Sequence, residues 1–104
     1  MKCLGVESTA HTFSCAVLER KGKRGEILSD VRKIYGPPEG EGIHPREASR
    51  HHVENSTVAL VEALQKAKVS VTDLDIISYA AGPGLGPCLR VGAVVSRALA
   101  SRSE

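Results

Sequence analysis

Aromatic residues are scarce in this sequence. It has no tryptophan, one phenylalanine and two tyrosines, which together make up 3% of its 104 residues. Hydrophobic residues still reach 41%, so the core must be built from valine, isoleucine, leucine and alanine. Long apolar runs are also missing, whereas a transmembrane helix needs about 20 consecutive apolar residues. We therefore expect one small globular domain with an aliphatic core and no membrane span.

Cysteine is too sparse for a disulfide framework or a zinc knuckle. Cys3, Cys15 and Cys88 are widely spaced and form no Cys-x-x-Cys pair. Glu7 interrupts the apolar residues at the N-terminus, so we expect no signal peptide. Free thiols without a signal peptide predict a cytoplasmic location. The net charge of +2 is too small to indicate a polyanionic partner by itself.

Glycine and proline are concentrated in one stretch, Gly82-Pro83-Gly84-Leu85-Gly86-Pro87, which we call the glycine loop. Three glycines and two prolines in six residues predict that no regular structure forms there. The preceding residues, Leu74–Ala81, are typical of a buried strand, and Leu89–Arg102 is typical of a helix. Such a connection points backbone N–H groups at one spot, which favours an anion such as phosphate. The alternative is a tight connection with no ligand.

Two common phosphate loops are excluded by the spacing. No lysine follows any glycine of the loop, so this is not a Walker loop. The glycines alternate with single residues, whereas a dinucleotide-binding fingerprint has the pattern Gly-x-Gly-x-x-Gly. An anion site here must therefore be of another type.

The rest of the chain predicts three strands and a long helix before the glycine loop. The basic segment Lys21–Gly25 is expected to be a hairpin loop, either solvated or in contact with nucleic acid. Residues 34–43 have no period and are expected to be a loop. The long helix, with Pro45 at its start, should bury an apolar face. The expected strands are Lys2–Val6, Phe13–Glu19 and Glu26–Lys33; the helix is Arg46–Lys68, and its apolar face is Val53, Thr57, Leu60, Val61 and Leu64.

The predicted order β-β-β-α-β-α is typical of a ribonuclease-H-like half-domain of the actin-like ATPase architecture, an α/β fold. A further strand normally follows the last helix in this architecture, so we expect that the chain is truncated after that helix. Apolar surface around Val91, Val95 and Leu99 should then stay exposed and form an interface. The predicted result is a homo-oligomer or a subunit interface through the helices Arg46–Lys68 and Leu89–Arg102.

The turn after the first strand is rich in small hydroxyl residues. Backbone N–H groups and hydroxyls in such a turn can bind phosphate oxygens, although an ordinary hairpin turn has the same composition. The histidines do not predict a metal site, because no two of them have the i, i+4 spacing. We interpret them as exposed or capping residues. The predicted wall of a nucleotide cleft is Glu7, Ser8, Thr9, His11, Gly82, Gly84 and Gly86, and the histidines are His11, His44, His51 and His52.

Three segments resemble one family, the tRNA threonylcarbamoyladenosine-synthesis proteins. This family comprises the catalytic subunit of the archaeal and eukaryotic KEOPS complex and the bacterial TsaD proteins. The similar segments are the first strand and turn (residues 4–12), the entry to the long helix (residues 42–52) and the glycine loop with the start of its helix (residues 81–92). They fall in the family's order and cover nearly the whole chain. Ala10-His11-Thr12 resembles the archaeal branch.

The resemblance implies tRNA processing by an acyltransferase. The full-length family transfers a threonylcarbamoyl group from its adenylate to N6 of the adenosine beside the anticodon, with tRNA and KEOPS-type subunits as partners. It uses a divalent metal, zinc or iron, held by a His-x-x-x-His pair beyond the glycine-rich helix. No such pair is present here, so the chain is expected to bind no cofactor and to contain no catalytic residue itself. The resemblance thus covers residues 1–104 as an N-terminal lobe, without the metal-binding second lobe.

Two other functions fit the same sequence. The chain resembles a non-catalytic lobe that dimerises or presents its two helices to another subunit. It also resembles half of an acyl- or sugar-kinase of the same superfamily. A kinase would need an acidic residue in the first turn to hold magnesium, and His11 stands where we expect that residue. The presence of a downstream lobe would discriminate the transferase from the interaction lobe.

Overall fold

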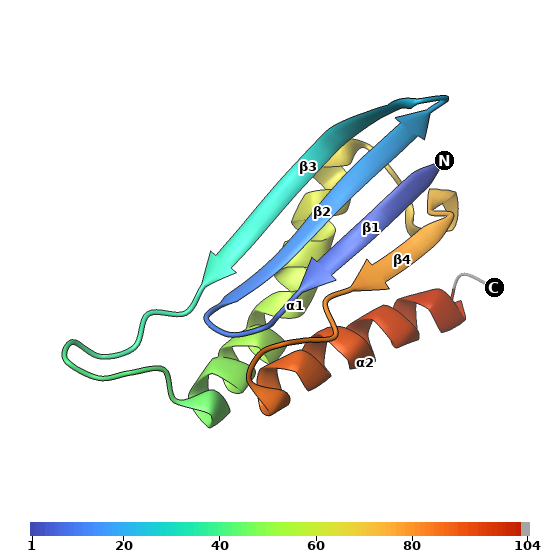
Figure 1. Ribbon diagram of the computed structural model, residues 1–104. Coiled ribbons are helices and arrows are strands. Elements are labelled where there is room, and N and C mark those ends of the chain that lie inside the picture. The colour runs from blue at the N-terminus through green and yellow to red at the C-terminus, as the bar shows by residue number, and fades with distance from the viewer. Residues whose placement is uncertain (103–104) are drawn as a thin grey trace.

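A computed structural model of the chain describes residues 1–102, which form one mixed sheet with two helices (Figure 1). The chain order confirms the predicted arrangement β-β-β-α-β-α. A short 3-10 helix, η1, precedes the last strand. The elements are β1 (Lys2–Glu7), β2 (Thr12–Lys21), β3 (Arg24–Ile34), α1 (Pro45–Ala67), η1 (Val71–Asp73), β4 (Ile76–Tyr79) and α2 (Gly86–Arg102).

The first three strands form the predicted antiparallel meander. The sheet order is β3-β2-β1-β4, and β4 runs parallel to β1. The hairpin between β2 and β3 is tighter than predicted, because only Gly22 and Lys23 separate the two strands. Gly22 adopts a φ of 62°, a conformation that glycine reaches without steric cost. Glycine at this position therefore allows both strands to extend toward the tip.

Both helices pack on the same face of the sheet. Ser29 on β3 donates a 2.8 Å hydrogen bond to the carbonyl of Ala63 on α1, and its cross-strand partner Val17 is fully buried. Val6 lies against Gly92 of α2. Figure 1 shows α1 crossing behind β2 and β3, and α2 running below β4. The buried hydrophobic core between these layers includes Leu4, Val6, Phe13, Cys15, Val17, Val31, Ala59, Ala63 and Val91.

The predicted apolar face of the long helix is only partly right, although the extent of the helix is close. Leu60 and Leu64 pack against the core as predicted. Val53 is 59% exposed and Val61 is 47% exposed, whereas small residues face the sheet. These small side chains let the helix backbone approach the strands closely, and the larger valines then lie toward the outer side. The buried residues of α1 are Ala48, His52, Ser56, Ala59 and Ala63.

The predicted buried strand Leu74–Ala81 is shorter and more exposed in the structure. Leu74 ends the 3-10 helix by donating its backbone N–H to the carbonyl of Val71, so β4 begins only at Ile76. β4 lies at the edge of the sheet, and Ile76 is 45% exposed. One face of this strand and one of its edges are therefore uncovered within residues 1–102.

The last helix begins earlier than predicted and exposes different residues. Gly86 and Pro87 form its first turn, where proline is tolerated because that N–H has no helical partner. Val91 is buried rather than exposed, and Val95 and Leu99 are half-buried against the core. The apolar surface predicted around these three residues lies instead at Val94, which is 59% exposed. Within residues 1–102, neither helix has the length and hydrophobicity that a membrane span requires.

Candidate functional site

The first residue of the turn between β1 and β2, Ser8, is held by α2. Ser8 is 1% exposed, and its hydroxyl donates a 2.7 Å hydrogen bond to the carbonyl of Cys88. The same oxygen accepts a 3.0 Å hydrogen bond from the backbone N–H of Gly92. A Cβ at Gly92 would lie 2.7 Å from this oxygen, so the close approach requires glycine. In this structure Ser8 therefore fixes the turn to α2.

The next residue of the turn is held by the glycine loop. The carbonyl of Thr9 accepts a 2.8 Å hydrogen bond from the backbone N–H of Leu85. Gly84 packs so closely that a Cβ on it would lie 2.5 Å from the same carbonyl oxygen. The structure thus brings together two segments that the sequence predicted as parts of one site, although about 75 residues separate them.

The next two residues of the turn, Ala10 and His11, are held by α1 and by the segment after β3. The carbonyl of Ala10 accepts a 2.7 Å hydrogen bond from Nε2 of His52 on α1. The carbonyl of His11 accepts a 2.7 Å hydrogen bond from the backbone N–H of Tyr35, which follows β3. Four consecutive residues are therefore anchored by four different parts of the chain. This arrangement presents the turn in one conformation, as a preorganised binding loop requires.

The carboxylate of Glu7 accepts hydrogen bonds from the turn itself. Its Oε1 accepts a 2.8 Å hydrogen bond from the backbone N–H of Thr9 and a bond from the Thr9 hydroxyl. Its Oε2 lies 3.4 Å from the hydroxyl of Ser14. Glu7 and His11 also line a polar hollow of about 410 Å³ at this end of the sheet. The other residues that line it are Thr12, Ser14, Asp30, Arg32 and Ile34.

The glycine loop is exposed at all three of its glycines. The peptide bond between Gly82 and Pro83 is cis, and Gly82 has a φ of 154°. Gly86 belongs to the first turn of α2, so the loop itself is shorter than predicted. An N-terminal helix turn carries partial positive charge, and no acidic side chain lies in this one. The exposed side of the loop can therefore attract an anion.

One histidine, His52, takes a position that the sequence reasoning missed, whereas His11 and His44 are exposed as predicted. His52 is fully buried, whereas it was predicted to be exposed or capping. Its spacing to Ser56 and Ala59 matches the small-residue stripe of α1, and this stripe was the signal that could have placed it. His44 occupies the N-cap of α1 but makes no side-chain capping bond; its Nε2 lies 3.2 Å from Glu41.

Metal-ligating side chains do not converge in the described part of the chain. Within residues 1–102, no three of the His, Cys, Asp and Glu side chains come together to hold an ion. The side chains present therefore do not fit the divalent metal that the family resemblance implies.

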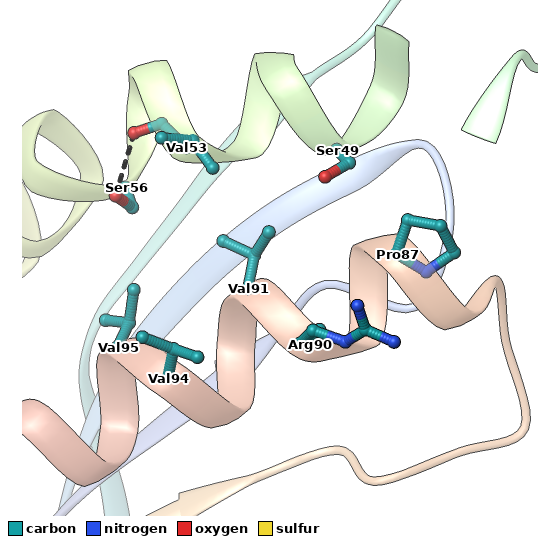
Figure 2. Close-up of a pocket in the computed structure, with 8 residues that line it drawn as sticks. All are labelled: Ser49, Val53, Ser56, Pro87, Arg90, Val91, Val94 and Val95. Atoms are coloured by element: carbon teal, nitrogen blue, oxygen red, sulfur yellow. Dashed lines mark hydrogen bonds between the residues drawn. The ribbon is translucent and has the colours of Figure 1, made fainter. Parts of the chain in front are cut away.

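A groove between α1 and α2 is a further concave feature, which was not predicted (Figure 2). It encloses about 360 Å³ and is mainly apolar. Figure 2 shows Val53 projecting from α1, with Val91 and Val94 on α2 and Arg90 near the helix start. The hydroxyl of Ser56 is directed to its own helix, because it donates a 3.0 Å hydrogen bond to the Val53 carbonyl. The remaining residues that line the groove are Ser49, Pro87 and Val95.

Two solved structures share the fold of this chain. YeaZ from Pseudomonas aeruginosa superposes with a TM-score of 0.72 over 99% of this chain and 41% of its own, at 18% identity. A second structure, described as an uncharacterised protein from the same organism with similarity to the peptidase YeaZ, also gives 0.72, at 19% identity. These likenesses support the predicted actin-like half-domain fold.

Sequence comparison gives the family. The chain is 52% identical over 100 residues to the tRNA N6-adenosine threonylcarbamoyltransferase of Pyrobaculum islandicum, covering 96% of this chain and 29% of that protein. It is 50% identical over 104 residues to that of Ignicoccus hospitalis, covering 100% of this chain and 30% of that protein. The chain thus spans about 30% of the length of these relatives. Residues 26–104 also match the family model described as TsaD, and with this identity they show that the chain belongs to the tRNA N6-adenosine threonylcarbamoyltransferase family.

Proposed function

We propose that residues 1–104 form the N-terminal lobe of a two-lobed transferase that modifies tRNA. The complete enzyme would move a threonylcarbamoyl group from its adenylate to N6 of the adenosine beside the anticodon. Family membership supports this assignment. The metal that the family uses, zinc or iron, would then be held by the second lobe. The family match also favours the transferase over the acyl- or sugar-kinase alternative.

One observation carries the proposal, the hydrogen bond from Leu85 N–H to the Thr9 carbonyl. This bond joins the hydroxyl-rich turn to the glycine loop, so that both lie at the same end of the sheet (Figure 1). We infer that the nucleotide part of the adenylate contacts the exposed side of this junction. Glu7, Thr9 and His11 would lie on one side and Gly82, Gly84 and Gly86 on the other. Ser8 would support this wall from behind.

A titration of the ¹⁵N-labelled chain with ATP, followed by NMR, tests this proposal. We expect shift changes centred on the amides of Thr9, Gly84 and Gly86. Binding should be weak, in the millimolar range, because ligand sites bury most of their ligand and this chain offers one wall. Micromolar affinity would contradict the one-wall proposal. Shift changes confined to the groove at Val53 and Val94 would contradict the location of the site.

The groove between α1 and α2 favours a second role, as an interface between subunits. Val53 and Val94 line it and are each 59% exposed. We infer that a second copy of this chain covers this face in solution. In the complete assembly a KEOPS-type subunit would be the alternative occupant.

Light scattering of the purified chain tests the interface. Val94→Glu places a charge in the groove and should shift a dimer toward monomer, because an uncompensated charge is costly to bury. Ile27→Glu is the matched control, since Ile27 is 66% exposed on β3 and does not line the groove. A monomeric wild-type chain at high concentration would refute self-association. Equal effects of both substitutions would refute the location.

A further inference from the structure

Two adjacent histidines on α1 form a chain of hydrogen bonds that ends on the turn. His52 is fully buried, and its Nε2 lies 2.7 Å from the carbonyl oxygen of Ala10. Its other ring nitrogen, Nδ1, lies 3.1 Å from Nδ1 of His51. A buried, fully bonded imidazole beside a binding turn is not needed to fill space, since an apolar side chain would do so.

The partners of the two rings determine where their protons lie. A carbonyl oxygen only accepts, so Nε2 of His52 must carry its proton and donate to Ala10. In a neutral imidazole the second nitrogen is then an acceptor, so Nδ1 of His51 must donate to it. The bonds therefore run in one direction, from His51 to His52 to Ala10. This leaves Nε2 as the unprotonated nitrogen of a neutral His51.

Neighbouring rings hold this arrangement in place. Phe13 on β2 lies 6.0 Å from His52 between ring centroids, and Tyr35 lies 5.8 Å from His51. The two imidazoles themselves meet edge to face, with centroids 5.2 Å apart. Burial lowers the pKa of His51, with a smaller effect from His52, which favours the neutral form of this ring at pH 7.

We propose that His51 and His52 are positioning residues, which fix the carbonyl of Ala10 and so set the nucleotide-facing turn through a single pair of tautomers. This inference rests on the proposed function of the turn. Ala10 lies between Thr9, which bonds to Leu85, and His11, which bonds to Tyr35. Loss of the His52 donor would leave a carbonyl unpaired at the centre of the turn and free both flanking contacts to move.

Direct observation of the imidazole tautomers is the first test. Long-range ¹H–¹⁵N NMR of the histidine-labelled chain at pH 8 distinguishes protonated from unprotonated ring nitrogens. We expect His52 to carry its proton on Nε2 and His51 to carry its proton on Nδ1. A proton on Nε2 of His51, or on Nδ1 of His52, would overturn the proposal. This measurement needs no nucleotide, so its result is independent of the proposed function.

Two substitutions of His52 provide the second test. In His52→Gln the side-chain amide can still donate to Ala10, whereas His52→Leu fills the space without a donor. We expect His52→Gln to keep the Leu85 and Tyr35 amide signals and the response of the turn to ATP, and His52→Leu to shift these signals and lose the response. Unchanged signals in His52→Leu would overturn the proposal.

If His52→Leu does not fold, the His52→Gln protein decides the question. Wild-type signals at Leu85 and Tyr35 in that protein would support a role for the donor, and their loss would overturn it. A wild-type chain without any response to ATP would contradict the proposed function, while the tautomers and amide signals would still test the positioning role.

Discussion

Replacing Gly84 by alanine tests the contact that joins the glycine loop to the turn. The added Cβ would lie 2.5 Å from the carbonyl oxygen of Thr9 and 3.0 Å from its Cα. An ordinary carbon–oxygen contact is about 3.3–3.6 Å, so the two segments would have to separate by roughly 1 Å. Both atoms of Thr9 belong to backbone that is already held by Leu85, so the clash cannot be relieved by rotating a side chain.

The expected cost of Gly84→Ala follows from three effects. Overpacking costs about 1–3 kcal/mol, and weakening the hydrogen bond from Leu85 to Thr9 costs about 0.5–1.5 kcal/mol. Alanine also restricts the unfolded chain, which offsets about 0.4–1 kcal/mol. The net loss of unfolding free energy should be about 1–4 kcal/mol, and Tm should fall by at least about 4 °C for a domain of this size.

Thermal and urea unfolding of Gly84→Ala and Gly86→Ala provide the measurement and its control. A Cβ at Gly86 meets no atom within 4 Å, and this residue lies in the first turn of α2. Alanine there should leave stability unchanged or raise it by up to about 1 kcal/mol. A Tm of Gly84→Ala equal to or above the wild-type value would refute the claimed close contact. A loss of the same size in both variants would refute its location.

Three further predictions concern stability and reactivity. Gly92→Ala should destabilise the chain, because its Cβ would lie 2.7 Å from Ser8 Oγ; in the double variant with Ser8→Ala the cost should be smaller than the sum, and additive urea midpoints would contradict this coupling. Burial lowers the pKa of His51 below 6.5, so the unfolded chain protonates first as the pH falls. Stability should therefore decrease below about pH 6.5, with a weaker decrease in His51→Gln, and a stability that rises with acid would be the contrary result. Burial raises the pKa of the Cys15 thiol to about 12, so a thiol reagent at pH 8 should modify the half-buried Cys3 first and Cys15 only on unfolding; rapid reaction of Cys15 would contradict its burial.

Element order could be predicted from the sequence because apolar runs and glycine positions alternate clearly along the chain. The buried face of α1 was predicted only in part, at Leu60 and Leu64, because a helical period selects large apolar residues wherever they recur. Val53 and Val61 fit a helical period, yet the sheet is approached through Ala59 and Ala63. The close contact between helix and sheet depends on the small volume of these two alanines. A hydrophobicity pattern gives alanine little weight, so it does not identify this face. The extent of Leu74–Ala81 was overestimated because strand length depends on pairing with β1.

The candidate site was predictable as two segments but not as an assembled unit. Hydroxyl residues after β1 and glycines before α2 each indicated phosphate chemistry, and the structure places Thr9 against Gly84. The roles of Ser8 and His52 could not be read from the sequence. Both depend on contacts with backbone carbonyls, those of Cys88 and Ala10, and carbonyls are present at every residue. No residue type marks which carbonyl is used.

The long sequence separation within the anchored turn has a consequence for protein synthesis. The hydrogen bond between Ser8 and Gly92 cannot form until Gly92, 84 residues later, has been synthesised. Likewise, the parallel pairing of β1 cannot form until β4 has been synthesised. Ribosomes add about 5–20 residues per second, so the turn emerges roughly 4–17 s before its final anchor is made. The pairings within the β1–β2–β3 meander join strands that are consecutive in the sequence, so they can form within that interval. A ribosome stalled before codon 92 should therefore display a folded meander whose turn lacks the Ser8–Gly92 hydrogen bond, and a protease should cut this turn between residues 8 and 11 faster than in the released chain.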